Sequence, residues 1–221
     1  MFVDSSSGEI ADHRQAVIKG VVSNQSVKLF LKRALDIVLG LSILILAGPI
    51  FILIACAIKL ESRGPVFFCQ LRNGKEGSLF KIYKFRSMQH NPTESFEQAR
   101  ENDPRITLIG KTIRKLSIDE LPQLINVLRG DMSIVGPRPH AVEHDRIYQN
   151  ELPGYMNRYK VKPGITGLAQ IRGHRGPTPS IYVMKKRLTA DLEYQEHWSL
   201  ARDFNILLQT LPAVLTKTNA H

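Results

Sequence analysis

An uncharged apolar run with a glycine–proline pair near its middle constrains this chain more than any other feature. The run extends from Ile37 to Ile58 and contains Gly48 and Pro49. As a single helix it would be about 33 Å long, enough to cross a bilayer core of about 30 Å. Pro49 opposes a continuous helix, because it lacks a backbone donor and clashes with the carbonyl of Ile45, at a cost of about 3 kcal/mol or more. A kink at Gly48 and Pro49 is therefore predicted.

Basic residues flank both ends of this run. Lys28, Lys32 and Arg33 precede it, and Lys59 and Arg63 follow it. Cationic flanks prefer the cytoplasmic side of a membrane. A break in the middle of the run allows both flanks to stay on that side. A re-entrant membrane helix is therefore favoured over a single span, and a buried pair of soluble helices is the third alternative.

The rest of the sequence is typical of one small domain of mixed α/β class, mostly helical. The chain has 221 residues, enough for one domain and an appendage. The predicted division is a flexible tail at 1–27, the re-entrant membrane helix at 28–60 and the globular domain at 61–221. Strands are expected at 65–70 and 79–85, helices near 110–117, 119–130, 140–151, 180–197 and 199–217, and a long loop at 161–180.

The charge balance limits the classes of partner. The net charge is +10 and the isoelectric point is about 9.8, which indicates nucleic acid, an anionic membrane face or phosphorylated substrates. Aromatic residues make up only 7% of the chain, and no basic stretch contains the interleaved aromatics that stack on bases. Nucleic acid is therefore not an expected partner.

The stretch RKLSIDELPQLINVLRGDMSIVGPRPH contains two adjacent acids among cations. Asp119 and Glu120 lie near an expected helix start, where Asp119 is predicted to be the N-cap, with Pro122 in the first turn. A capping box between Ser117 and Glu120 is the alternative. Arg138 follows between two prolines, in a setting suited to bidentate phosphate contact. Acids among cations indicate a metal-bound diphosphate, whereas surface ion pairs are the simpler explanation for any single residue.

At this point the sequence resembles the bacterial sugar transferase family, the monotopic polyprenyl-phosphate sugar-1-phosphate transferases. The matching segments are KRALDIVLGLSILILAGPIF, GPVFFCQLRNGKEGSLFKIYKFRSM, RKLSIDELPQLINVLRGDMSIVGPRP and VKPGITGLAQIRG. The resemblance implies transfer of a sugar phosphate from a UDP-sugar to undecaprenyl phosphate, with release of UMP. It also implies a monotopic enzyme with a Pro-kinked re-entrant helix in the bilayer, on the cytoplasmic face of the bacterial inner membrane.

The resemblance implies roles for individual residues by position. Asp119 would be the nucleophile that forms a phospho-sugar intermediate, and it would help to hold Mg²⁺. Glu120 would be its acidic partner. One departure concerns the kink, where the family often has Ser before the Pro and this chain has Gly48.

Cationic positions are implied in the same way. Arg114 and Arg138 match phosphate-binding positions of the family. Lys84 and Arg86 lie in the segment KFRSM, which matches another family motif, and they are candidates to bind substrate phosphate.

The donor sugar is weakly indicated by a late loop. The segment IRGHRGPT resembles the branch of the family that transfers hexoses, and its Arg172 and Arg175 are candidates to contact phosphate or hydroxyl groups. UDP-glucose is the favoured donor, UDP-galactose the second and N-acetylated sugars the third.

Two other classes of function stay open from the sequence. One is a nucleic-acid-binding module at a membrane surface, whose binding would fall steeply with salt. The other is a non-catalytic membrane scaffold of a polysaccharide assembly complex, in which the acid pair would only cap a helix. A homo-oligomer is one of the assemblies that the sequence allows.

Overall fold

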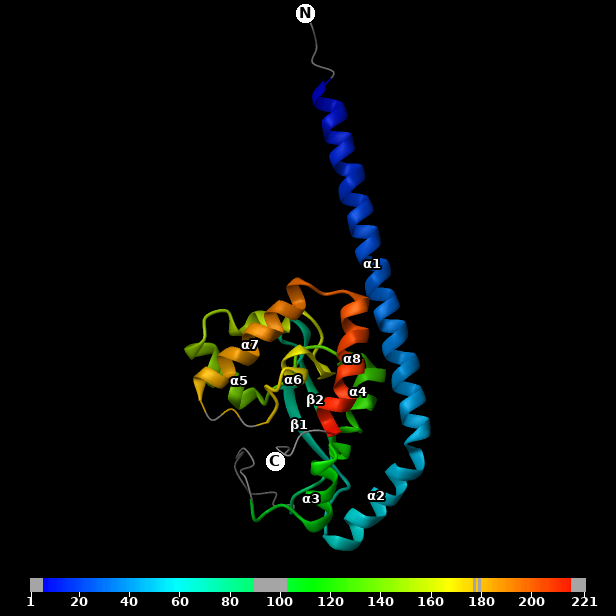
Figure 1. Ribbon diagram of the computed structural model, residues 1–221, viewed down its shortest axis with the longest axis vertical. Helices are drawn as coiled ribbons and strands as arrows, with labels where there is room; N and C mark the ends of the chain where they lie inside the picture. Colours follow the sequence, from blue (N-terminus) through cyan, green and yellow to red (C-terminus); the bar gives the residue numbers. More distant parts are fainter. Residues whose placement is uncertain (1–5, 90–102, 177, 179, 216–221) are drawn as a thin grey trace, which may run out of the picture.

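The computed structural model describes residues 6–89, 103–176, 178 and 180–215. It has the predicted mixed and mostly helical composition, with a long helix alongside a small globular part (Figure 1). The α-helices are α1 Ser6–Leu46, α2 Gly48–Glu61, α3 Leu108–Lys115, α4 Gln123–Arg129, α5 Val142–Glu151, α6 Leu168–Ile171, α7 Ile181–Glu196 and α8 Leu200–Leu215. The 3₁₀ turns are η1 Lys75–Gly77, η2 Ile118–Glu120 and η3 Tyr155–Lys160, and the strands are β1 Phe67–Asn73, β2 Leu79–Phe85, β3 Ser133–Val135 and β4 Gly164–Thr166.

The apolar run is interrupted where the sequence predicts a break. Helix α1 ends at Leu46, helix α2 begins at Gly48, and the axes of the two segments differ by 59°. Pro49 lies in the first turn of α2, where a missing backbone donor costs nothing. Among the described helices, no single one is long and apolar enough to cross a membrane, but the bent pair Asn24–Leu46 and Gly48–Glu61 is when taken together.

The stretch predicted to be a flexible tail is helical over most of its length, and its flexibility stays a prediction. Helix α1 already begins at Ser6 and continues without interruption into the apolar run, and the first five residues lie outside the described part. The physical reason is cooperativity, since extending a helix that has already formed costs far less than starting one.

Two small sheets organise the globular part. Strands β1 and β2 form an antiparallel hairpin in which Phe67 pairs with Phe85, as the sequence predicts. Strands β3 and β4 pair in parallel, with Ser133 opposite Gly164. Strand β4 and helix α6 lie inside the stretch predicted to be a long loop, so that prediction is wrong for residues 164–171.

The main hydrophobic core lies between the β1–β2 hairpin, β3 and the helices α4, α6, α7 and α8. Among its fully buried members are Ile82, Val127, Met132, Tyr194 and Ile206. Helix α8 presents Ile206 to this core but leaves Phe204 and Leu208 about 60% exposed. The core therefore forms a support of helices and short strands beneath the loops that contain the predicted site.

Three polar residues attach α1 to the globular part. The Arg33 guanidinium donates to the carbonyls of Val127 (2.6 Å) and Leu128 (2.9 Å) at the end of α4. Lys32 forms an ion pair with Asp203 of α8 at 2.6 Å. The buried carboxylate of Asp36 accepts hydrogen bonds from the backbone of Ile134 (2.9 Å) and the hydroxyl of Ser133 (3.0 Å).

Candidate active site

The two acids of the site lie on a tight turn rather than at the start of α4. Asp119 and Glu120 belong to η2, and the N-cap of α4 is Pro122, so the predicted N-cap role of Asp119 is wrong. The alternative capping box is also absent, because the Ser117 side chain caps no backbone donor. Ser117 has a left-handed backbone, with φ 57° and ψ 20°. This conformation reverses the chain after α3 and buries both carboxylates beneath it.

The carboxylate of Glu120 accepts hydrogen bonds from cationic side chains of the site. The Lys84 ammonium donates to it at 2.8 Å, and the Arg138 guanidinium binds both carboxylate oxygens, at 2.9 Å through Nη1. Arg175 lies 3.9 Å from the same carboxylate. Burial alone would raise the pKa of Glu120, but Arg138 and Lys84 outweigh it and hold that pKa well below its usual range. Glu120 is therefore ionised and its oxygens are occupied.

Asp119 has the opposite environment, although it is the adjacent residue. No hydrogen bond or ion pair of its carboxylate occurs within the described part of the chain, and only 9% of the residue is exposed. Burial, and then the negative charge of Glu120, raise the pKa of Asp119 to about 6, against the opposing effect of Lys84, Arg114 and Arg138. The oxygens of Asp119 are free to bind something else.

Lys84 lies beside Glu120 because strand β2, which contains Lys84, is bound to α4. A buried side-chain amide on α4 makes this connection. The side chain of Asn126, which is fully buried, accepts from the backbone of Tyr83 at 3.0 Å and donates to the carbonyl of Lys81 at 2.7 Å. These two bonds join β2 to α4, the helix that directly follows Glu120. Lys84 then reaches Glu120 from the adjacent position on the strand.

The structure brings most of the predicted site residues together, with two exceptions. Arg114, in the last turn of α3, is near enough to act electrostatically on Asp119. Arg86 is instead buried against the end of α2, where it donates to the carbonyls of Ser62 (2.8 Å) and Arg63. Arg172 forms a bidentate pair with Glu193 of α7. A phosphate-binding role for Arg86 or Arg172 stays a prediction that these contacts do not favour.

A divalent metal ion would find one available carboxylate here. No group of three or more acidic, histidine or cysteine side chains with metal-binding geometry occurs among the described residues. Glu120 is occupied by cations, whereas no cation of the described ranges pairs with Asp119. Mg²⁺ usually binds through one or two carboxylates, substrate phosphates and waters rather than in an all-protein cage. The donor set at Asp119 fits that type of site.

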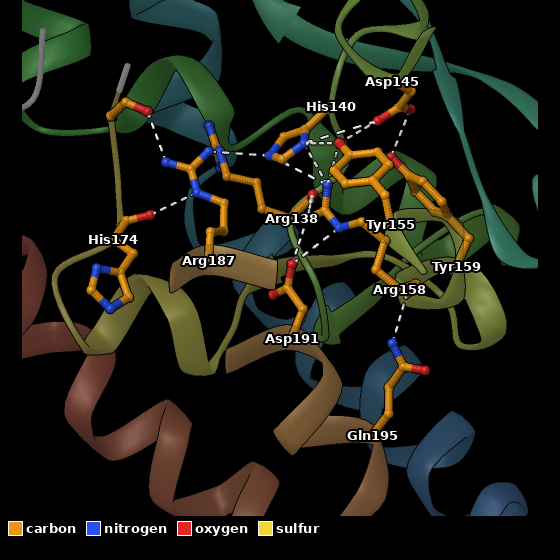
Figure 2. A network of polar contacts seen from close by, with 11 residues as sticks. Arg138, His140, Asp145, Tyr155, Arg158, Tyr159, His174, Arg187, Asp191 and Gln195 are labelled. Carbon is orange, nitrogen blue, oxygen red and sulfur yellow. Dashed lines mark hydrogen bonds and ion pairs between the residues drawn. The ribbon is translucent and has the colours of Figure 1, made fainter. Parts of the chain in front are cut away.

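A buried network behind the site supports Arg138 (Figure 2). Arg158, which is 1% exposed, forms an ion pair with Asp191 at 2.6 Å and donates to the backbone carbonyl of Arg138 at 2.8 Å. His140, two residues after Arg138, lies against Arg158 and receives a contact from Arg187 at 3.1 Å. The buried Arg158 side chain therefore holds the Arg138 backbone in place.

The same network supports the loop that contains Arg175. Arg187 donates to the carbonyls of His174 and Gly176, both at 2.9 Å, so it binds the backbone on either side of Arg175 (Figure 2). Sequence analysis missed these supporting residues. In the sequence, Arg158 and Arg187 look like the cations of exposed helix faces. The one feature that pointed to a supporting network was His140, which directly follows GPRP. The missed residues are His140, Asp145, Arg158, Arg187 and Asp191.

Comparison with known proteins identifies the family of the chain. Residues 27–217 match the family model described as bacterial sugar transferase. The chain belongs to the bacterial sugar transferase family. It is 49% identical over 191 residues to the UDP-glucose:undecaprenyl-phosphate glucose-1-phosphate transferase of Caulobacter vibrioides, a match that covers 86% of this chain and 72% of that protein.

Two further relatives differ in length. The Escherichia coli K12 protein of the same name is 53% identical over 182 residues, which cover 82% of this chain but only 39% of that protein. The exopolysaccharide production protein PSS of Rhizobium leguminosarum is 44% identical over 194 residues, covering 86% of this chain and 97% of that protein. This sugar transferase chain therefore spans well under half of the Escherichia coli relative and nearly all of the Rhizobium one.

Proposed function

We propose that the chain transfers hexose-1-phosphate from a UDP-sugar to undecaprenyl phosphate and releases UMP. The names of the Caulobacter and Escherichia coli relatives support UDP-glucose as the donor. The name of the Rhizobium relative supports a role in exopolysaccharide synthesis, and we propose that this transfer is its first membrane step. UDP-galactose, the second donor expected from the sequence, has no support from these names. A non-catalytic scaffold is the alternative that the experiment below tests.

The observation that supports this reaction best is the difference between two adjacent carboxylates. Glu120 holds Lys84 and Arg138 in place, while the Asp119 carboxylate is buried, without a partner among the described residues, and next to those cations. A pKa of about 6 leaves Asp119 mostly ionised at neutral pH. An ionised carboxylate beside positive charges suits nucleophilic attack on a phosphorus atom.

The proposed reaction has two displacement steps at one phosphorus. A carboxylate oxygen of Asp119 attacks the sugar-bearing phosphorus, the bond from that phosphorus to the bridging oxygen breaks, and UMP leaves with the electron pair. An oxygen of undecaprenyl phosphate then attacks the same phosphorus, and the bond to Asp119 breaks, which regenerates the carboxylate. Lys84, Arg114 and Arg138 stabilise the negative charge that develops on the phosphoryl oxygens.

We include Mg²⁺ in the proposal, with Asp119 as its protein ligand. When bound, the ion would neutralise the diphosphate oxygens and so favour departure of UMP. Arg114 and Arg138 would orient the phosphates around the same carboxylate.

We also propose that the chain lies on the cytoplasmic face of the bacterial inner membrane, with α1 and α2 entering and leaving the bilayer from one side. The bend of 59° between them supports this arrangement. Apolar side chains on both sides of the bend are largely exposed, among them Leu46 at 79% and Leu53 at 69%. Exposed apolar surface of this extent is typical of contact with lipid.

Replacement of Asp119 tests the reaction. The Asp119→Asn protein should keep its fold, while UMP release from UDP-glucose falls by about 10³-fold or more, as expected for loss of a nucleophile. Without the lipid acceptor, the unmodified protein should release up to about one UMP per molecule and gain the mass of one hexose phosphate on the Asp119 peptide. Mass spectrometry and UMP release measure both results.

A matched control removes a carboxylate elsewhere. Glu76 is exposed on the η1 turn, so Glu76→Gln should release UMP at the unmodified rate. An adduct on a different peptide, or full activity in Asp119→Asn, would contradict Asp119 as the nucleophile. Absence of UMP release from the unmodified protein with any UDP-sugar would favour the scaffold alternative.

A further inference from the structure

Arg72, at the end of β1, lies beside the candidate active site although the sequence analysis did not select it. Its backbone forms an isolated antiparallel bridge with Ala141, three residues after Arg138. The next residue, Asn73, donates to the Asp145 carboxylate of α5 at 2.6 Å. The end of β1 is therefore docked on the segment that follows Arg138, and this docking uses the backbone of Arg72 and not its guanidinium.

The Arg72 guanidinium is incompletely paired. Its Nη2 donates to the Gln70 amide at 2.6 Å, whereas its Nε is buried and has no hydrogen-bond partner. No acid lies within ion-pair distance of it in the described part of the chain. Arg138 shares Glu120 with Lys84, and Arg158 has Asp191. Arg72 thus differs from Arg138 and Arg158, because no acid among the described residues forms an ion pair with it.

A second positive charge, that of Arg138, acts on this incompletely paired side chain. Burial, and then the positive charge of Arg138, lower the pKa of Arg72 to about 10, although Tyr159, Asp145 and Glu120 act in the opposite direction. Keeping two buried guanidinium groups near enough to repel each other, when only Arg138 is paired with an acid, costs free energy in the unliganded protein. An anion bound between them would remove that cost.

We infer that Arg72 and Arg138 together form a phosphate subsite, in which Arg72 donates to a phosphate oxygen of a substrate. The inference rests on the proposed function only for the source of that phosphate. The source is either the diphosphate of the sugar-nucleotide donor or the phosphate of the lipid acceptor. Guanidinium groups suit this role because their donors match phosphate oxygens in pairs.

The first experiment measures anion binding to the full chain in detergent. Arg72→Gln should unfold at the same temperature as the unmodified protein or higher without ligand, because an unpaired buried charge is removed. Its affinity for inorganic pyrophosphate, measured from the shift of the unfolding temperature, should fall roughly tenfold or more, as expected for loss of a charge-assisted hydrogen bond. Arg146→Gln, an exposed change of the same charge on α5, should leave both quantities unchanged.

The opposite pattern would overturn the inference. A lower unfolding temperature of Arg72→Gln with unchanged pyrophosphate affinity would mean that Arg72 only supports the fold. Arg72→Lys distinguishes charge from geometry, since it should keep part of the affinity but lose the paired donors.

The second experiment identifies the source of the phosphate. A contact with the donor predicts weaker UDP-glucose binding by Arg72→Gln and slower UMP release without acceptor. A contact with the lipid predicts an unchanged first step and a higher KM for undecaprenyl phosphate. Either result supports the subsite, and no change in both overturns it. The unmodified protein could bind no UDP-sugar while Arg72→Gln binds pyrophosphate more weakly than the unmodified protein does. In that case the proposed function fails and the subsite stands.

Discussion

Asp119 and Glu120 have opposite pKa shifts although they share one turn of backbone. Burial affects both, and the difference comes from the cations, because Lys84 and Arg138 direct their donors to Glu120, whereas no described residue donates a hydrogen bond to Asp119. The ion pairs with Glu120 keep Lys84 and Arg138 in place before substrate binds. Preorganised charge of this kind costs no reorganisation during the reaction.

His140 is the residue whose titration the structure predicts most directly. Burial first, and then Arg158, Arg187, Arg72 and Arg138, lower its pKa well below the ordinary value. An unfolded histidine binds a proton near pH 6.5, whereas the folded one does not. The unfolded state therefore takes up more protons as pH falls below about 6.5, so the free energy of unfolding should decrease on acidification.

A comparison with His140→Gln isolates this effect. Below about pH 6, the free energy of unfolding of the unmodified protein should fall by about 1.4 kcal/mol per pH unit more steeply than that of the variant. Urea unfolding in detergent between pH 5 and pH 8 measures both slopes. Equal slopes would mean that His140 is protonated in the folded protein.

The individual site residues could be predicted only in part from the sequence. Asp119, Glu120, Lys84, Arg138 and Arg175 were selected by motif and do lie together. The distribution of hydrogen bonds among them could not be read from spacing, because Lys84 and Arg175 reach Glu120 from segments far apart in the chain. The pKa of Asp119 depends on that three-dimensional arrangement and was therefore missed.

At the scale of elements, the pairing of β3 with β4 depends on close contact between glycines. A Cβ atom on Gly164 would lie 2.1 Å from the backbone nitrogen of Gly136 and 2.6 Å from its Cα. Backbone atoms cannot move away as a flexible side chain would. This contact sets the position of the segment between β3 and Arg138.

Gly164→Ala should therefore lower the free energy of unfolding by about 2 kcal/mol or more through overpacking. Gly48→Ala is a matched control, because nothing lies within 4 Å of a Cβ at that position. Thermal unfolding of the two variants should show a decrease only for Gly164→Ala. Equal stability of both would contradict the tight contact.

The elements with a local signal were predicted well, and those that depend on partners were not. The β1–β2 hairpin and the helices α3, α5, α7 and α8 follow from alternation, periodicity and turn residues near them in sequence. Strand β4 is only three residues long and forms because β3 lies beside it. Its Gly- and Pro-rich sequence favours a loop when read alone.

At the scale of the whole molecule, the bent helix pair leads to a test of topology. In a chain without native cysteines, single cysteines at Gly20→Cys and Lys75→Cys should both be labelled from the cytoplasm. Labelling of position 20 from the periplasm would indicate a true span. Pro49→Ala permits a straight helix, so part of that population should move to the spanning form, as measured by the fraction labelled from each side.

Because Asp36 is bound to β3, the number of residues that follow it in α1 fixes the position of the bend. The helix rises about 16 Å between Asp36 and Ala47, and Asp36 is fixed to the globular part at one end of this interval. Each residue inserted there would advance the bend by about 1.5 Å and rotate the exit of α2 by about 100°. The number of residues in this interval thus sets how far the bend lies from the contact with β3. It also sets the direction in which α2 leads the chain back to the globular part.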